Sequence, residues 1–216
     1  MLSLLFPPKC TLCRQLLSGA ESDLCHNCRE NAPEFLRAKS NIPFIAHWTA
    51  VWYYKDNVRK SIHRFKFGAA RHYADVYSRL LAIKLQNALW AEDYDILTWV
   101  PVSLPRRLKR GYDQSALVAQ ALGRELQIPA TRTLNKIRHT PPQSGIREAA
   151  RRRANVLGAY KLRRDISLSG KRILLVDDVV TTGATASECA RILLTAGAKE
   201  VILAAVAAAS HDKNNM

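Results

Sequence analysis

The chain has 216 residues, of which 48% are hydrophobic and 24% charged, and its 33 Lys and Arg against 18 Asp and Glu give a formal net charge of +15. This length allows one large hydrophobic core, or one core with a small additional module. The longest apolar runs are too short or too interrupted to cross a bilayer, and residues 1–6 are too short for a secretory signal, so we expect a cytoplasmic protein without membrane insertion.

Four of the five cysteines form two Cys-x-x-Cys pairs near the N-terminus. Cys10 and Cys13 make the first pair, Cys25 and Cys28 the second, and eleven residues separate them. Four thiolates can surround Zn²⁺ tetrahedrally, and so short a segment needs a metal to fold. Two disulfides are the alternative, which a cytosolic location disfavours. We therefore predict a structural zinc-binding module of four cysteines with its polar linker over residues 1–40, and a main domain over residues 41–216.

The main domain begins with alternating strand and helix patterns. Residues 47–54 are aromatic and β-branched and predict a strand. Residues 58–67 and 73–89 have apolar side chains at helical spacing and predict two helices. Residues 95–102 predict a buried strand, and residues 114–126 predict an amphipathic helix.

The alternation continues to the end of the chain. Residues 131–144 indicate a loop or an irregular pair of strands, and residues 147–155 a short basic helix. Residues 171–176 predict a strand, residues 185–196 a helix and residues 200–208 a final strand. Such alternation is typical of an α/β fold, in which helices flank a mostly parallel sheet and ligands bind at the carboxyl ends of strands.

Two adjacent acids follow the predicted strand at residues 171–176. That strand is a continuous apolar run, so we expect it to be covered on both faces. Asp177 and Asp178 stand at its carboxyl end. Two carboxylates there are costly unless they meet a ligand, and the hydroxyl groups of a ribose suit them.

The loop after the acids is suited to bind a phosphate. Its residues are Thr181, Thr182, Gly183, Ala184 and Thr185. Glycine allows a tight turn that brings backbone N–H groups close to an anion, and the following helix N-terminus adds free donors and the positive end of a dipole. A capping box of Thr185 and Glu188 is an alternative that needs no ligand. The Gly-x-x-x-x-Gly-Lys pattern of a P-loop is absent.

The string from Ile173 to Thr185 resembles the signature of type I phosphoribosyltransferases. In that family the acidic pair contacts the ribose hydroxyls of phosphoribosyl pyrophosphate, the loop holds the 5-phosphate, and Mg²⁺ assists. The resemblance implies a catalytic role for Asp177 and Asp178. It implies phosphoribosyl pyrophosphate contacts for the residues that follow, namely Val179, Val180, Thr181, Thr182, Gly183, Ala184 and Thr185.

A second resemblance covers nearly the whole chain. The cysteine pairs are followed by Arg107–Ser115, then by Gln143 with several arginines, and then by the acidic string. This order resembles the ComF family, which includes competence proteins and GntX-like proteins. Some members carry additional cysteine pairs, whereas this chain has two.

Basic residues in the middle of the chain are candidate diphosphate contacts. From Ser103 to Arg164 there are fifteen Lys and Arg residues but only three acids. The superfamily places its pyrophosphate loop after the strand at residues 95–102. This implies contacts from Val102, Ser103, Arg106, Arg107, Lys109 and Arg110. Arg147 and Arg151 lie one helical turn apart and suit either a bound polyphosphate or a nucleic-acid backbone, and Lys66 is a weaker candidate.

Two functions remain open from the sequence. The first is a phosphoribosyltransferase that binds phosphoribosyl pyrophosphate with Mg²⁺ and has an acceptor the sequence does not identify. The second is an accessory protein for DNA uptake that binds single-stranded DNA or competence proteins and uses the phosphoribosyl site for ligand binding only. The superfamily resemblance allows a homodimer, but no sequence feature requires one.

Overall fold

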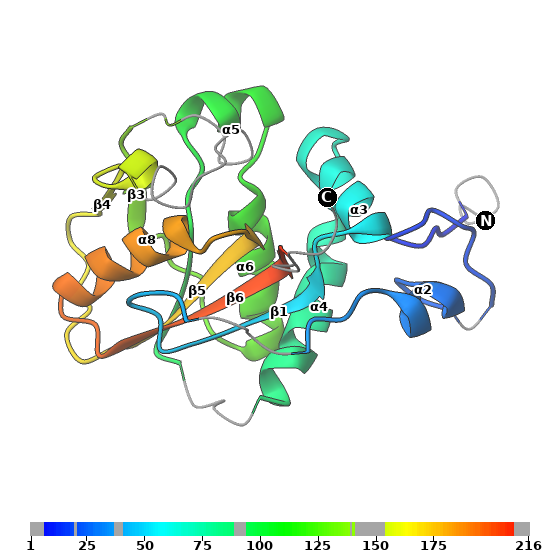
Figure 1. The fold of residues 1–216 in the computed structure, drawn as a ribbon, viewed down its shortest axis with the longest axis horizontal. Helices are drawn as coiled ribbons and strands as arrows, with labels where there is room; N and C mark the ends of the chain where they lie inside the picture. The colour runs from blue at the N-terminus through cyan, green and yellow to red at the C-terminus, as the bar shows by residue number, and fades with distance from the viewer. Residues whose placement is uncertain are drawn as a thin grey trace.

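A four-stranded parallel sheet forms the centre of the computed structural model, which describes residues 7–19, 21–36, 41–88, 94–138, 140 and 154–209 (Figure 1). Its strand order is β1-β6-β5-β2. The strands are β1 (His47–Tyr53), β2 (Ile96–Trp99), β5 (Arg172–Val180) and β6 (Glu200–Ala208). Each neighbouring pair is parallel. The predicted α/β class with a mostly parallel sheet is therefore confirmed.

Helices cover both faces of the sheet. The described helices are α2 (His26–Asn31), α3 (Asp56–Phe67), α4 (Tyr73–Gln86), α5 (Leu104–Arg110), α6 (Gln114–Leu126) and α8 (Ala184–Thr195), of which α4, α6 and α8 pack against the sheet. One face carries α4, which contacts β1 and β6, and α6, which contacts β2 and β5. Helix α8 lies on the opposite face, next to an antiparallel ribbon of β3 (Leu134–Lys136) and β4 (Tyr160–Leu162) (Figure 1).

Strand β5 contributes to two hydrophobic cores, one on each face of the sheet. Leu174 and Val176 belong to the core beneath α4 and α6. Ile173 and Leu175 belong to the core beneath α8. All four side chains are fully buried. This double coverage explains why β5 is a continuous apolar run rather than an alternation of apolar and polar residues.

The predicted bounds of helices and strands agree best with the structure where the local sequence pattern alone defines the element. The predicted helix at 114–126 and the strand at 200–208 have the bounds of α6 and β6. In contrast, β5 does not end at Val176 but continues to Val180 and contains the two acids. The longer strand is possible because Val179 and Val180 pair with Ala207 and Ala208 of β6.

The segments around β3 and β4 differ from the prediction in a similar way. The partner of β3 is β4, which follows about two dozen residues later, rather than another part of residues 131–144. Helix α5 was not predicted, because none of its residues is buried and it therefore has no apolar face. Most of the basic helix predicted at 147–155 lies outside the described residues, although residues 154 and 155 are helical.

The cysteine-bearing segment packs against α3 and α4. The Oγ of Ser61 donates to the backbone O of Thr11 at 2.6 Å. The Nη2 of Arg64 donates to the O of Thr11 at 3.0 Å and to the O of Leu12 at 2.6 Å. Leu12 also belongs to the core that includes α4 and α6. The segment is therefore attached to the main domain by polar and apolar contacts.

Residues 33–35, which were predicted to be part of a linker, form backbone hydrogen bonds with β1. Phe35 N donates to the O of Val51, and Tyr53 N donates to the O of Pro33, so this stretch lies antiparallel along β1. The predicted domain boundary at residue 40 falls in residues 37–40, outside the described ranges, and stays a prediction. No helix within the described ranges is long and apolar enough to span a bilayer.

Replacement of Arg64 by Met should weaken the attachment of the cysteine-bearing segment. Two backbone carbonyls would lose a charged donor, so the free energy of unfolding should fall by about 1.5–3 kcal/mol. Urea denaturation measures this change, and Arg59→Met is the matched control because Arg59 is exposed on the same helix. Equal stability of the two variants would contradict the attachment described here.

Candidate metal centre and ligand-binding cleft

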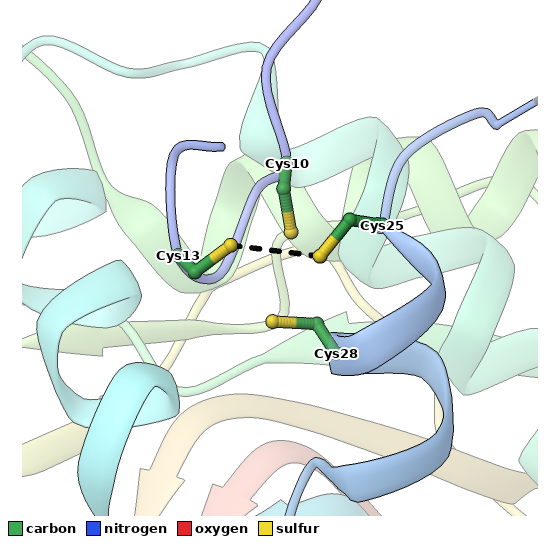
Figure 2. Close-up of side chains that lie close together, drawn as sticks. All are labelled: Cys10, Cys13, Cys25 and Cys28. Carbon is green, nitrogen blue, oxygen red and sulfur yellow. Dashed lines mark hydrogen bonds between the residues drawn. The ribbon is translucent and has the colours of Figure 1, made fainter. Parts of the chain in front are cut away.

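The four N-terminal cysteines converge into one cluster. Their Sγ atoms all lie within 4.8 Å of one another, and the Sγ atoms of Cys13 and Cys25 are 3.6 Å apart (Figure 2). A disulfide would require about 2.05 Å, whereas two thiolates on one tetrahedral Zn²⁺ are separated by about 3.8 Å. All four cysteines are free thiols in the structure, so the disulfide alternative is not realised.

Local structure directs the four sulfurs toward one point. Cys10 and Cys13 flank a tight turn, Cys25 stands at the N-terminus of α2, and Cys28 lies in its first turn (Figure 2). Four thiolates fill a tetrahedral coordination shell and leave no open position for a substrate. The donor set therefore fits a structural zinc ion, as predicted.

The acidic pair on β5 is held by residues from two helices. Asp177 Oδ1 accepts hydrogen bonds from Ser115 Oγ of α6 at 3.0 Å and from the backbone N of Asp178 at 2.8 Å. Asp178 Oδ2 pairs with Lys66 Nζ of α3 at 3.0 Å. Burial, followed by the charge of Asp178, raises the pKa of Asp177 to about 7. Asp177 is thus poised to change its ionisation near neutral pH.

The loop after β5 has a backbone and a hydroxyl group suited to a ligand. Gly183 has a φ of 72° and precedes α8, and a Cβ there would lie 2.7 Å from the side chain of Ile42. The Oγ1 of Thr182 is buried and has no hydrogen-bond partner among the described residues. The first N–H groups of α8 have no intrahelical acceptors. Thr182 and the start of α8 therefore offer donors of the kind that suits an anion.

The alternative of a capping box is wrong. Helix α8 begins at Ala184 with Gly183 as its N-cap, so Thr185 lies inside the helix. Glu188 instead accepts from the backbone N of Gly158 at 2.9 Å and from Arg191 at 2.9 Å. The acid therefore ties α8 to the segment before β4 rather than to its own first turn.

The loop, the acidic pair and part of the basic segment line one cleft of about 1210 Å³. The predicted residues that line it are Lys66, Val102, Arg106, Arg110 and all of Asp177–Thr185. Ser103 is buried, and Arg107 and Lys109 are exposed outside the lining. Arg147 and Arg151 lie outside the described residues.

Two of the arginines that line the cleft, Arg106 and Arg110, belong to α5. Arg106 Nη2 donates to the O of Thr140 at 2.6 Å, and Arg110 Nη1 donates to Oε1 of Gln114 at 2.8 Å. The loop before α5 is held by Asp113, whose Oδ2 accepts from the backbone N of Val102 at 3.0 Å and whose Oδ1 accepts from the first turn of α6. The carboxylate of Asp113 therefore fixes the position of both the loop before α5 and the start of α6.

Sequence reasoning missed several residues of the cleft, among them Lys136 of β3 and Tyr160 of β4. Lys136 Nζ donates to the phenol oxygen of Tyr160 at 3.1 Å and lies 5.0 Å from its ring centroid. Burial, and then the charge of Arg106, lowers the pKa of Lys136 to about 8. No motif marks these residues, and only the β3–β4 pairing brings them to the cleft.

Comparison with known proteins gives two matches to family models. Residues 113–215 match the phosphoribosyl transferase domain, and residues 1–39 match the double zinc ribbon domain. The zinc match agrees with the sulfur geometry described above.

The chain is similar to curated proteins along most of its length. It is 32% identical over 197 residues to the DNA utilization protein YhgH of Escherichia coli O157:H7, a match that covers 88% of this chain and 81% of the relative. It is 28% identical over 215 residues to competence protein F of Haemophilus influenzae, with 89% and 93% covered. Among solved structures, a glutamine phosphoribosylpyrophosphate amidotransferase from B. subtilis has a TM-score of 0.45 at 22% identity and covers 66% of this chain and 30% of its own.

Replacement of Cys28 by Ser should remove the zinc and destabilise the protein. The wild type should hold one zinc ion per chain by elemental analysis, and the variant should hold none. The loss of metal should lower the free energy of unfolding by on the order of 3 kcal/mol or more. Cys189→Ala is the control, because Cys189 is buried in α8 and should leave the zinc content unchanged. A wild type without zinc would refute the assignment.

Replacement of Asp177 by Asn should stabilise the ligand-free protein at alkaline pH. The pKa of Asp177 is raised in the folded state, so the wild type loses stability as pH rises from about 4 to about 7. The stabilisation by Asn should be about 2–4 kcal/mol larger at pH 8 than at pH 4. Urea denaturation at both pH values measures the difference.

The matched control for this pH dependence is Asp95→Asn, for which the opposite sign is expected. A hydrogen bond from the backbone N of Arg172, and then one from Lys171, lowers the pKa of Asp95. Its ionised form therefore stabilises the fold at neutral pH, and its replacement should destabilise the protein at pH 8. A change in stability of the same sign in both variants at pH 8 would show that burial does not control the pKa of Asp177.

Proposed function

The chain belongs to the family of the DNA utilization protein YhgH and competence protein F, and from this premise we propose that it binds phosphoribosyl pyrophosphate with Mg²⁺ and transfers the phosphoribosyl group to an acceptor. The observation that carries the proposal is the convergence in one cleft of the acidic pair, the Thr182 hydroxyl, which has no partner among the described residues, and Arg106 and Arg110 of α5. The match of residues 113–215 to the phosphoribosyl transferase domain supports it.

Each part of phosphoribosyl pyrophosphate has a complementary group in the cleft. The Thr182 hydroxyl and the first N–H groups of α8 suit the 5-phosphate. The carboxylates of Asp177 and Asp178 suit the ribose hydroxyls. Arg106, Arg110 and Lys136 supply positive charge for the diphosphate. The cleft thus offers donors for both phosphate ends and acceptors for the sugar between them.

Mg²⁺ fits the same carboxylates. Carboxylate and phosphate oxygens are its preferred ligands, and it usually binds proteins through one or two carboxylates together with substrate oxygens. Asp177 and Asp178 are the two acids available at the end of β5, and when bound the ion would neutralise charge on the diphosphate. Deprotonation of Asp177 is required for this role, so binding should strengthen as pH rises through about 7.

The proposed reaction is a displacement at the anomeric carbon. A lone pair of the acceptor forms a bond to that carbon, the carbon–oxygen bond to diphosphate breaks, and its electron pair leaves with the diphosphate. The acceptor's proton goes to solvent or to a basic group. Positive charge develops on the ribose as the bond breaks, and the carboxylates of Asp177 and Asp178 stabilise it, while Arg106 and Arg110 stabilise the departing anion.

A second candidate is binding of single-stranded DNA in support of DNA uptake. The net charge of +15 and the exposed basic residues outside the cleft favour it, and relatives carry the names competence protein and DNA utilization protein. These exposed residues include Arg107, Lys109, Arg138, Lys161 and Arg163. Contacts to a DNA backbone would make the affinity fall steeply with salt. A weak affinity that is flat across salt concentrations would exclude this function.

Calorimetric titration of phosphoribosyl pyrophosphate with Mg²⁺ tests the first function. The wild type should bind, and an Asp177→Asn, Asp178→Asn double variant should bind at least about a hundredfold more weakly, because the carboxylates meet both the sugar and the metal. The control Asp95→Asn lies outside the cleft lining and should bind like the wild type. Absence of binding to the wild type would refute the proposal.

A further inference from the structure

Helix α3 presents one face to the cleft that the proposed phosphoribosyl site does not use. Arg59, His63 and Phe67 are spaced by four residues, and Lys60 lies one turn before His63, so the four side chains share a helical face. All four are exposed and line the cleft. The opposite face of α3, with Val58, Ile62 and Phe65, is buried. In Figure 1, α3 stands beside the carboxyl ends of β5 and β6, across from α5.

The cations of this face are available to a ligand. Arg59 and Lys60 form no ion pair with another described residue. Their neighbours on α3 are occupied, because Arg64 holds the carbonyls of Thr11 and Leu12 and Lys66 pairs with Asp178. Asp56 is the one carboxylate from the described part of α3 that lines the cleft. Asp56 offsets one of the two cations, so the face keeps a net positive charge.

An aromatic ring stands at the end of the same face. Phe67 is 57% exposed, although His63 lies against it with ring centroids 4.8 Å apart and the guanidinium of Arg110 lies 4.9 Å from its centroid. Exposure of so large an apolar ring inside a cleft is unfavourable in water and favours a planar ligand that covers it. The contact with Arg110 also joins α3 to α5, so the ring stands next to the groups expected to hold the diphosphate.

We propose that the α3 face formed by Arg59, Lys60, His63 and Phe67 binds a small phosphorylated compound with an aromatic ring, of the nucleoside monophosphate class, beside the phosphoribosyl site. The two cations receive the phosphate, and Phe67 with His63 stacks on the ring. The inference rests on the function proposed above, since it names the class of molecule held next to bound phosphoribosyl pyrophosphate. The bridge from Arg110 to Phe67 across the cleft favours a compact ligand over a continuous strand.

The test is calorimetric titration of AMP and of adenosine into the full chain saturated with phosphoribosyl pyrophosphate and Mg²⁺. Saturation matters because AMP itself contains a ribose 5-phosphate and would otherwise compete for the loop at Thr182. AMP should bind at least about tenfold more tightly than adenosine. An Arg59→Met, Lys60→Met variant should lose that preference and keep its affinity for phosphoribosyl pyrophosphate. Lys161→Met is the control, because Lys161 is exposed outside the cleft lining.

Phe67→Ala should weaken both AMP and adenosine by about the same factor, since it removes the stacking surface but no charge. Equal affinities for AMP and adenosine, or no binding of AMP to the protein saturated with phosphoribosyl pyrophosphate, would overturn the inference alone. A single-stranded oligonucleotide that displaces AMP with a steep salt dependence would overturn it in favour of a polymer. If phosphoribosyl pyrophosphate fails to bind while AMP binds in an Arg59- and Lys60-dependent manner, the function proposed above fails and the ligand class of the α3 face stands.

Discussion

Two carboxylates enclosed at the end of a doubly covered strand impose the main constraint on this molecule. β5 is packed between two strands and between two cores, and it carries Asp178 to a buried position and Asp177 to a half-buried one in the wall of the cleft. Their charges are tolerated because α6 supplies the hydroxyl of Ser115 and α3 supplies the ammonium of Lys66. Compensation is incomplete, as the raised pKa of Asp177 indicates. A half-buried acid that lines a cleft and has a raised pKa is characteristic of a functional site.

Helix α3, which supplies Lys66 to the acidic pair, also links the cleft to the cysteine cluster. The carbonyls of Thr11 and Leu12, inside the first cysteine pair, accept from Arg64 and Ser61. One half-turn later, Lys66 reaches Asp178. The cysteine-bearing segment therefore supports the cleft, because it is bonded to α3 and α3 forms one wall of the cleft. Metal binding and the geometry of the acidic pair share a single structural support.

The parts of the structure that the sequence could predict are those encoded within one short segment. The cysteine pairs and the acidic string are each contiguous, so both could be predicted without knowledge of the fold. The parts that were missed depend on distant partners. The length of β5 depends on Ala207 and Ala208, and the position of Lys136 depends on its pairing with Tyr160. Helix α5 was not predicted because it has no buried face. The basic face of α3 was not recognised because only the fold shows that it lines the same cleft as α5.

The stretch that joins the cysteine module to the sheet limits how the module could be exchanged during evolution. Residues 33–35 run along the edge of β1, and Ile42 fills the space behind Gly183 that a side chain would otherwise occupy. The connector is thus part of the wall behind the phosphate loop. Recombination that exchanged the module for another would disturb the loop unless it also replaced the connector. An exchanged module would therefore have to bring a connector that makes the same contacts with β1 and Gly183.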